Sequence, residues 1–210
     1  MTPAPAGPVI GLLLAAGAGT RLGRPKALVT DRDGRSWLGR AVDALRDGGV
    51  DASYVVLGAE AEHVQRQLTS ETRGRASVTI IGAADWADGM GASLRAGLGA
   101  VIADQPAAGA VIVMLVDTPG VGAAVVRRLI NLGAPGVLAR ASYDGVPGHP
   151  VLLGRDHWHG ALDVAHADRG ARDYLKSRSV RLVECGDIGS GEDVDTAHAL
   201  GEWLAMGDPD

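Results

Sequence analysis

Two basic side chains, Arg21 and Lys26, lie in a glycine-rich stretch that follows a short apolar run. The stretch contains Gly17, Gly19 and Gly23, which have no Cβ, so several consecutive backbone N–H groups can turn toward one anion. The two side chains add full positive charge beside those groups. These residue types are suited to a polyphosphate, and they predict an anion-binding loop.

The spacing of these residues excludes two common glycine loops. A P-loop requires Lys-Ser or Lys-Thr directly after its second glycine, whereas Gly23 is followed by Arg24-Pro25-Lys26. The dinucleotide fingerprint G-x-G-x-x-G would need its third glycine where this chain has Leu22. The loop therefore belongs to another class of phosphate site.

Asp117 is the strongest candidate for a metal ligand. It ends the run 110–116, the most apolar stretch of the chain, which predicts a central strand because it has no polar face. Mg²⁺ prefers carboxylate oxygen and completes its shell with water and substrate phosphate. If this strand neighbours the strand before the glycine loop, Asp117 lies beside that loop; otherwise it simply ends a strand.

Asp193 and Asp195 form a second acidic pair near the end of the chain. They are two residues apart, so their side chains share one face of an extended segment. Acidic residues at this point also suit the N-terminus of the helix expected over 197–206. Asp195 is the better candidate for a second metal ligand, with Asp193 as its neighbour, and both roles can coexist.

The elements that must position these residues alternate between strands and helices. Strands are predicted for the apolar run that ends at Leu14 and for residues 54–57, 78–81, 110–116, 136–139 and 180–185. Helices are predicted for residues 36–47, 59–68, a segment that ends near 103, 122–132 and 197–206. This alternation predicts a three-layer α/β/α fold with a mostly parallel, Rossmann-like sheet. Residues 140–153 break the pattern and predict a small β excursion, with a turn at 143–145.

The composition is that of one globular domain. Of the 210 residues, 46% are hydrophobic and 21% are charged, and we expect one domain over residues 9–210 after a flexible tail over residues 1–8. The net charge is -5 and the basic residues form no run, which argues against nucleic acid as a partner. The single cysteine, Cys185, excludes an intramolecular disulfide and favours the cytoplasm. No apolar stretch approaches the ~20 residues that span a bilayer, so we expect no membrane partner.

The stretch from Leu14 to Lys26 resembles the signature loop L-A-A-G-x-G-x-R-x-G-x-x-K of nucleotidyltransferases. Further motifs follow in family order: W-x-x-G-M-x-x-S-L at 86–94, D-x-P at 117–119, G-H-P-V at 148–151, D-x-G-A-R at 168–172 and D-[IV]-D-T at 193–196. The chain thus resembles the MobA-like NTP transferase family over residues 9–200, with its best match in the molybdenum cofactor cytidylyltransferase branch. The resemblance implies the nucleotide-diphospho-sugar transferase fold. One departure is Ala-His-Ala-Leu at 197–200, where the family usually has P-E-D-L.

The resemblance also implies roles for individual residues. The implied nucleotide-binding residues are Leu14, Ala15, Ala16, Gly17, Gly19, Arg21, Lys26 and Ser93, of which Arg21 and Lys26 are also catalytic. The implied metal is Mg²⁺, held by Asp117 with Asp195 and Asp193 beside it. The implied acceptor-binding residues are His149, Arg169 and Arg172. Ser93 also suits a capping or packing position at a helix start, and His149 suits a structural role in its turn.

His157 and His159 are two residues apart, with no further Cys or His at metal-ligand spacing. Such a pair is typical of surface residues at a helix start, and we interpret it as no metal site.

The implied reaction is attack by a phosphate of the acceptor on the α-phosphorus of a nucleoside triphosphate, with release of pyrophosphate. The attacking oxygen is already anionic, so no general base is required. Ala16 favours CTP, because guanylyl-transferring relatives tend to carry glycine there; molybdopterin is the expected acceptor, and an apo-molybdoenzyme would receive the product. Two other functions stay open. One is a carrier of the molybdopterin nucleotide without turnover, and the other is an oxidoreductase of a nicotine-derived pigment, as some relatives are described.

Overall fold

The computed structural model describes residues 7–72 and 78–206. Residues 1–6 of the expected tail lie outside this part of the chain. The strands are β1 (Val9–Ala15), β2 (Ala52–Leu57), β3 (Val78–Gly82), β4 (Ala110–Leu115), β5 (Leu138–Tyr143), β6 (Val146–Gly154) and β7 (Arg181–Glu184). The α-helices are α1 (Trp37–Gly48), α2 (Ala61–Thr72), α3 (Met90–Asp104), α4 (Ala123–Ile130), α5 (Trp158–Val164), α6 (Arg172–Lys176) and α7 (Ala197–Met206). Short 3-10 helices are η1 (Lys26–Leu28), η2 (Trp86–Asp88), η3 (Arg155–His157) and η4 (Ala167–Arg169).

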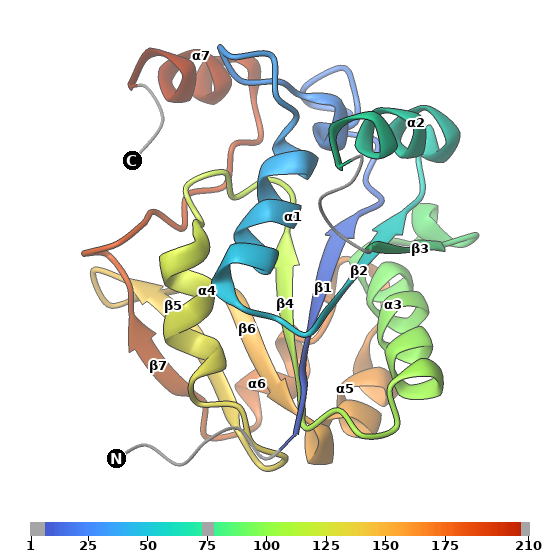
Figure 1. The fold of residues 1–210 in the computed structure, drawn as a ribbon, viewed down its shortest axis with the longest axis vertical. Coiled ribbons are helices and arrows are strands. Elements are labelled where there is room, and N and C mark those ends of the chain that lie inside the picture. The colour runs from blue at the N-terminus through green and yellow to red at the C-terminus, as the bar shows by residue number, and fades with distance from the viewer. Residues whose placement is uncertain (1–6, 73–77, 207–210) are drawn as a thin grey trace.

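The strands of the described residues form one sheet in the order β3-β2-β1-β4-β6-β5-β7 (Figure 1). β1 lies between β2 and β4 and runs parallel to both. β6 is antiparallel to β4 and to β5, while β7 is parallel to β5. The mostly parallel sheet is therefore confirmed, with β6 as the strand that runs the other way.

The β5–β6 hairpin is the predicted β excursion. Its turn residues, Asp144 and Gly145, have φ values of 51° and 78°. Positive φ at both central residues is the backbone that favours Asp-Gly in a two-residue hairpin. The hairpin places β6 beside the central strand β4, where another βα unit would have been expected from the preceding pattern.

Helices cover both faces of the sheet, which gives the predicted three layers (Figure 1). Successive residues of a strand point to opposite faces, and in β1 Leu13 packs into the core beneath α1, α2, α4 and α7. Its neighbour Leu12 packs into the second core, with α3, α5 and α6. β1 is buried along its whole length because both of its faces are covered.

Helix α1 begins and ends almost as predicted. The Ser36 hydroxyl accepts a hydrogen bond of 2.9 Å from the Gly39 amide, which caps the N-terminus. Gly49, with φ at 98°, ends the helix in the left-handed conformation that glycine adopts at little cost. The Trp37 ring at the start of α1 meets Trp203 of α7 edge to face, with ring centroids 5.5 Å apart. This contact fixes the last helix over the same end of the sheet as the glycine loop.

Register in the centre of the sheet brings two loops together. Leu14 of β1 pairs with Leu115 of β4, so both strands end at the same level. The Val116 amide also donates a hydrogen bond of 3.2 Å to the Leu14 carbonyl. The two strands are thus neighbours, which is the condition under which the sequence places Asp117 beside the glycine loop.

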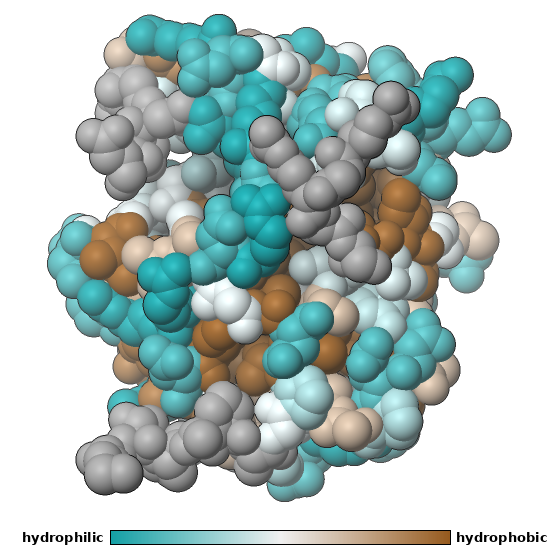
Figure 2. Space-filling model, viewed as in Figure 1, coloured by the Kyte–Doolittle hydropathy of each residue, from teal (hydrophilic) through white to brown (hydrophobic). Residues whose placement is uncertain are grey.

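Figure 2 shows the face of the molecule that carries α1 and α4. Hydrophilic residues cover most of it, and hydrophobic residues are visible between the α1–α4 pair and α3, over the sheet. None of the helices in the described residues is long and apolar enough to cross a membrane.

Close packing of α3 on the sheet gives a prediction about stability. A Cβ at Gly97 would lie 2.5 Å from Leu12 Cδ1 and 2.6 Å from Val56 Cγ2, whereas a Cβ at Gly99 meets nothing within 4 Å. Gly97→Ala should lower the free energy of unfolding by about 1 to 3 kcal/mol through overpacking. Gly99→Ala, the same change two residues along the same helix, should raise it by up to about 1 kcal/mol. Urea denaturation measures both, and stabilisation by both substitutions would contradict this packing.

Candidate active site

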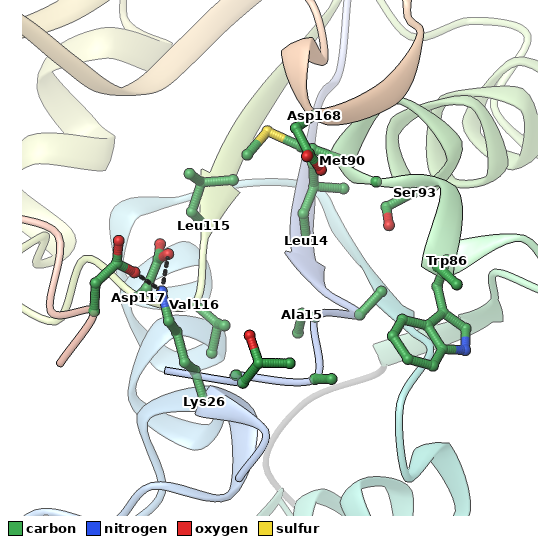
Figure 3. A pocket seen from close by; sticks show the side chains of 18 of the residues that line it. Leu14, Ala15, Lys26, Trp86, Met90, Ser93, Leu115, Val116, Asp117 and Asp168 are labelled. Carbon is green, nitrogen blue, oxygen red and sulfur yellow. Dashed lines mark hydrogen bonds and ion pairs between the residues drawn. The ribbon is translucent and has the colours of Figure 1, made fainter. Parts of the chain in front are cut away.

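A pocket of about 450 Å³ opens at the edge of the sheet where β1 and β4 end (Figure 3). Its walls come from the glycine loop, η2, the start of α3, the residues after β4, and two aspartates from later segments. Its size is in the range of small-molecule sites. All eight residues predicted to bind nucleotide line it: Leu14, Ala15, Ala16, Gly17, Gly19, Arg21, Lys26 and Ser93.

The glycine loop has a backbone that other residues would not adopt easily. Gly19 has φ at 62° and Gly23 has φ at 77°. The Leu22 amide donates a hydrogen bond of 2.9 Å to the Gly19 carbonyl and closes the turn. A Cβ at Gly19 would overlap the Arg24 carbonyl oxygen, so this position requires glycine for space as well as for its φ. The chain then enters η1 at Lys26, which directs this side chain back toward the pocket.

Lys26 joins two aspartates that are far from it in the sequence. Its ammonium donates a hydrogen bond of 2.7 Å to Asp117 Oδ2, and a second to Asp195 Oδ1. Arg21 Nη1 lies 3.0 Å from the other oxygen of Asp195. Figure 3 shows Lys26 directed at Asp117 at one end of the pocket. Arg21 and Lys26, predicted to bind phosphate, thus form one charged cluster with two of the predicted metal ligands.

The Asp195 segment is tied to β4 through the backbone. The Val194 amide donates a hydrogen bond of 3.0 Å to the Asp117 carbonyl, and Val194 is buried. Asp195, directly after this anchor, reaches the cluster, while α7 begins two residues later. A single backbone contact therefore places Asp195 beside Asp117, and these are two of the three predicted metal ligands.

The charges of the cluster shift one another's pKa values. Partial burial disfavours the charged form of Lys26, but Asp117 and Asp195 outweigh it and raise its pKa. The hydrogen bond from Lys26, assisted by Arg21, lowers the pKa of Asp195. Partial removal from solvent, together with the Asp117 and Asp195 carboxylates, raises the pKa of Asp193. The negative charges of Asp117 and Asp195 thus act on Asp193. Lys26 stabilises the ionised form of Asp195.

One atom in the cluster is suited to a metal ion. Asp117 Oδ1 is buried and has no hydrogen-bond partner in the described residues, so a carboxylate oxygen there is free to accept a cation. No three His, Cys, Asp or Glu side chains in that part of the chain form a metal-binding group of their own. The oxygen atoms of Asp117 and Asp195 therefore fit a hard divalent cation, which usually completes its shell with water and other ligands.

The three predicted acceptor-binding residues lie outside the pocket lining and differ in their surroundings. Within the described part of the chain, the buried Nδ1 atom of His149 has no hydrogen-bond partner, and burial together with the nearby Arg140 lowers the pKa of His149 to about 4. Asp117 and Arg172 are also near enough to affect that ring. Arg169 Nη1 instead lies 3.0 Å from Asp173 Oδ2 on an exposed surface. His149 and Arg172 thus gather on the Asp117 side of the site, and Arg169 is engaged elsewhere.

Several residues of the pocket lining received no role from the sequence, among them Trp86, Met90 and Asp168. Trp86 and Met90 line the wall around Ser93, and Asp168 comes from η4 (Figure 3). Trp86 and Met90 belong to the W-x-x-G-M motif, and Asp168 is the first residue of D-x-G-A-R. These motifs are the sequence signal that could have identified the three residues as part of the site. Helix α3 begins at Met90, so Ser93 lies in its first turn.

The class of protein to which this fold and charged pocket belong is shown by a family match. Residues 11–182 match the MobA-like NTP transferase domain, and the chain belongs to this family. The resemblance drawn from the motifs is thereby confirmed at the level of the family.

Individual relatives share most of the chain. Nicotine blue oxidoreductase of Paenarthrobacter nicotinovorans is 35% identical over 202 residues, which cover 91% of this chain and 94% of the relative. The crystal structure of Rv0371c from Mycobacterium tuberculosis H37Rv is 30% identical, with a TM-score of 0.78, and covers 95% of this chain and 99% of its own. A complex of Rv0371c with manganese has a TM-score of 0.74 at 29% identity, with coverage of 95% and 100%.

The fold extends to more distant proteins. The 4-diphosphocytidyl-2C-methyl-D-erythritol synthase structure from Anaerococcus prevotii DSM 20548 has a TM-score of 0.75 at 13% identity and covers 96% of both chains. This confirms the nucleotide-diphospho-sugar transferase fold.

The loop geometry predicts a difference between two glycine substitutions. An alanine at either position would have to adopt the left-handed conformation, which is costly. At Gly19 its Cβ would also clash with the Arg24 carbonyl, whereas a Cβ at Gly23 meets nothing within 4 Å in the described residues. We expect losses of local stability of about 2 to 4 kcal/mol for Gly19→Ala and about 1 to 2 kcal/mol for Gly23→Ala. Hydrogen exchange of the Leu22 amide measures the opening of the loop. Equal exchange rates in the two variants would show that Gly19 is not sterically required.

Proposed function

We propose that this protein transfers CMP from CTP to a phosphate of the molybdenum cofactor and releases pyrophosphate, with Mg²⁺ as the metal. The observation that carries the proposal is the joining of Arg21 and Lys26 with Asp117 and Asp195 at one end of a nucleotide-sized pocket. Membership of the NTP transferase family supports the triphosphate as substrate. Ala16 supports cytidine over guanosine, and we expect the reaction in the cytoplasm.

The chain's own residues hold the reacting groups in place. The amides of the loop from Gly17 to Gly23 and the Lys26 ammonium bind the triphosphate, and Arg21 stabilises the negative charge that accumulates on the pyrophosphate. An acceptor phosphate oxygen forms a bond to the α-phosphorus, while the bond to the bridging oxygen breaks and its electron pair leaves with pyrophosphate. His149 and Arg172, on the Asp117 side, are proposed to orient the acceptor.

Asp117 and Asp195 would hold the Mg²⁺ ion, which when bound neutralises charge on the phosphates. The unpartnered Asp117 Oδ1 supports this assignment. Lys26 contacts both aspartates in this structure, so it has to move from the carboxylates to the phosphates when nucleotide and metal enter. The Lys26 ammonium thereby pairs first with the carboxylates and then with the phosphates.

A second candidate is suggested by the relative named nicotine blue oxidoreductase. That activity requires an electron donor, and the glycine loop of this chain lacks the dinucleotide fingerprint. Fold alone does not separate the two functions. Oxidation of NADH or NADPH in the presence of nicotine blue, followed at 340 nm, would identify the redox function. A carrier function would give nucleotide binding without pyrophosphate release.

Pyrophosphate release tests the proposed function. The protein is incubated with Mg²⁺, molybdenum-loaded molybdopterin and CTP, GTP or UTP in separate assays. We expect release with CTP, and a loss of at least about 100-fold in kcat/KM for Asp117→Asn, because a metal contributes several kcal/mol of charge stabilisation. Asp187→Asn is the matched control, since Asp187 is exposed and pairs with Arg128 away from the pocket. No release with any of the three nucleotides would reject the proposal.

Arg21 allows a sharper test of the leaving-group role. Its side chain is 73% exposed and lines the pocket, so its removal should disturb the fold little. Arg21→Ala should lower kcat about 100- to 1000-fold, as for loss of one preorganised charge-stabilising group. Arg24→Ala removes the same charge from the same loop at a residue that does not line the pocket, and should leave kcat within about 3-fold. Full turnover by Arg21→Ala would remove this residue from the mechanism.

A further inference from the structure

Asp168 places a carboxylate in the pocket at a point that the proposed chemistry does not use. It lies in η4, between α5 and α6, and lines the pocket next to Met90 (Figure 3). Ser93 and Trp86 also line the pocket, on the side opposite Lys26 and Asp117 (Figure 3). Among the described residues, no hydrogen bond or ion pair joins the Asp168 side chain to another residue. An ionised carboxylate that faces a pocket without a partner accepts hydrogen bonds readily and donates none.

Close backbone packing fixes the position of Asp168. A Cβ at Gly89 would lie 2.6 Å from the Ala167 carbonyl carbon and would overlap Asp168 Oδ1, and a Cβ at Gly91 would lie 2.8 Å from the Ala165 carbonyl. The segment before Asp168 therefore lies directly on the start of α3, at two positions that only glycine can occupy. Ala167 itself has φ at 46°, a conformation that a non-glycine residue adopts only when its surroundings impose it.

Side chains of α3 also hold the same segment. Arg95 of α3 donates a hydrogen bond to the Ala165 carbonyl. Met90 of α3 also packs against the turn, since its Sδ atom would lie 3.1 Å from a Cβ at Gly170. The Asp168 carboxylate thus lies on a tightly packed turn, as expected of a group that binds a ligand in a fixed position.

The charge of Asp168 indicates which part of a bound nucleotide can lie next to it. The cations Arg21 and Lys26 lie at the Asp117 end of the pocket, where the triphosphate is proposed to bind. Figure 3 shows Asp168 beside Met90, apart from the Lys26–Asp117 pair. A carboxylate next to a triphosphate would repel it, so the part of the ligand near Asp168 has to be uncharged and has to offer a donor.

We propose that Asp168 accepts a hydrogen bond from an O–H or N–H group of the nucleoside and so helps to select which nucleotide binds. This inference rests on the proposed nucleotide-binding function. Two parts of a nucleoside offer such donors: the ribose hydroxyls, which all ribonucleotides share, and the exocyclic amine, which cytosine has and uracil lacks. A site built to pair with a donor rejects an analogue that lacks it, because its own acceptor is then left unpaired.

Calorimetric titration with Mg²⁺ present tests the proposal through binding, independently of turnover. The ligands are CTP, UTP, 2′-deoxy-CTP and 3′-deoxy-CTP, and the proteins are wild type, Asp168→Ala and Asp168→Asn. We expect Asp168→Ala to raise the Kd of CTP about 10- to 100-fold, the value of one hydrogen bond to a charged group. Asp168→Asn keeps an acceptor oxygen and should lose less. Asp163→Ala, an exposed aspartate of α5 outside the pocket, is the matched control.

The pattern across ligands identifies the donor. If the donor is the base amine, the substitution weakens CTP and both deoxy analogues but not UTP. If it is a ribose hydroxyl, the deoxy analogue that lacks this hydroxyl is the one left unchanged. Equal weakening of all four ligands, or no weakening of any, would overturn the proposal. If wild type binds none of them, it is the proposed function that fails; if wild type binds CTP and the Asp168 variants bind equally well, only this inference fails.

Discussion

The Lys26 ammonium between two carboxylates is the interaction on which the geometry of the site depends. Asp117 and Asp195 come from β4 and from the segment before α7, and without a cation between them their charges would repel. The three side chains are partly shielded from solvent, with 17% to 32% of their surface exposed, so water screens this repulsion only in part. Lys26 thus holds the two carboxylates side by side, and the proposed triphosphate would bring its own anionic oxygens to the same ammonium.

The centre of the sheet makes this interaction possible. β1 and β4 pair in parallel and end at one edge of the sheet. The backbone alone therefore makes the glycine loop and Asp117 neighbours. Backbone hydrogen bonding of Val194 to Asp117 then adds the third component, and the Trp37–Trp203 contact holds α7 above it. The Asp168 end of the pocket is constructed differently, because glycines at the start of α3 let the turn at Asp168 pack directly on the helix.

Much of this arrangement is predictable from local sequence, and the exceptions have physical reasons. The apolar run ending at Asp117 has no polar face and specifies a central strand, and Ser36 with Gly49 marks α1 at both ends. The turn that carries Asp168 follows the β excursion, where no periodic pattern fixes the path of the chain, and its place is set by contacts made more than 70 residues away in sequence. The Lys26 bridge is also a product of tertiary structure, since the motif alone directs Lys26 to phosphate.

The most direct test of the account is a crystal structure with CTP and Mn²⁺ bound, in which the anomalous signal locates the metal. We expect manganese at coordination distance, about 2.0 to 2.2 Å, from an Asp117 oxygen, with the triphosphate along the loop from Gly17 to Gly23 and Lys26 moved from the carboxylates to a phosphate. Manganese away from Asp117, or a triphosphate bound outside the loop while Lys26 still joins both aspartates, would contradict the account.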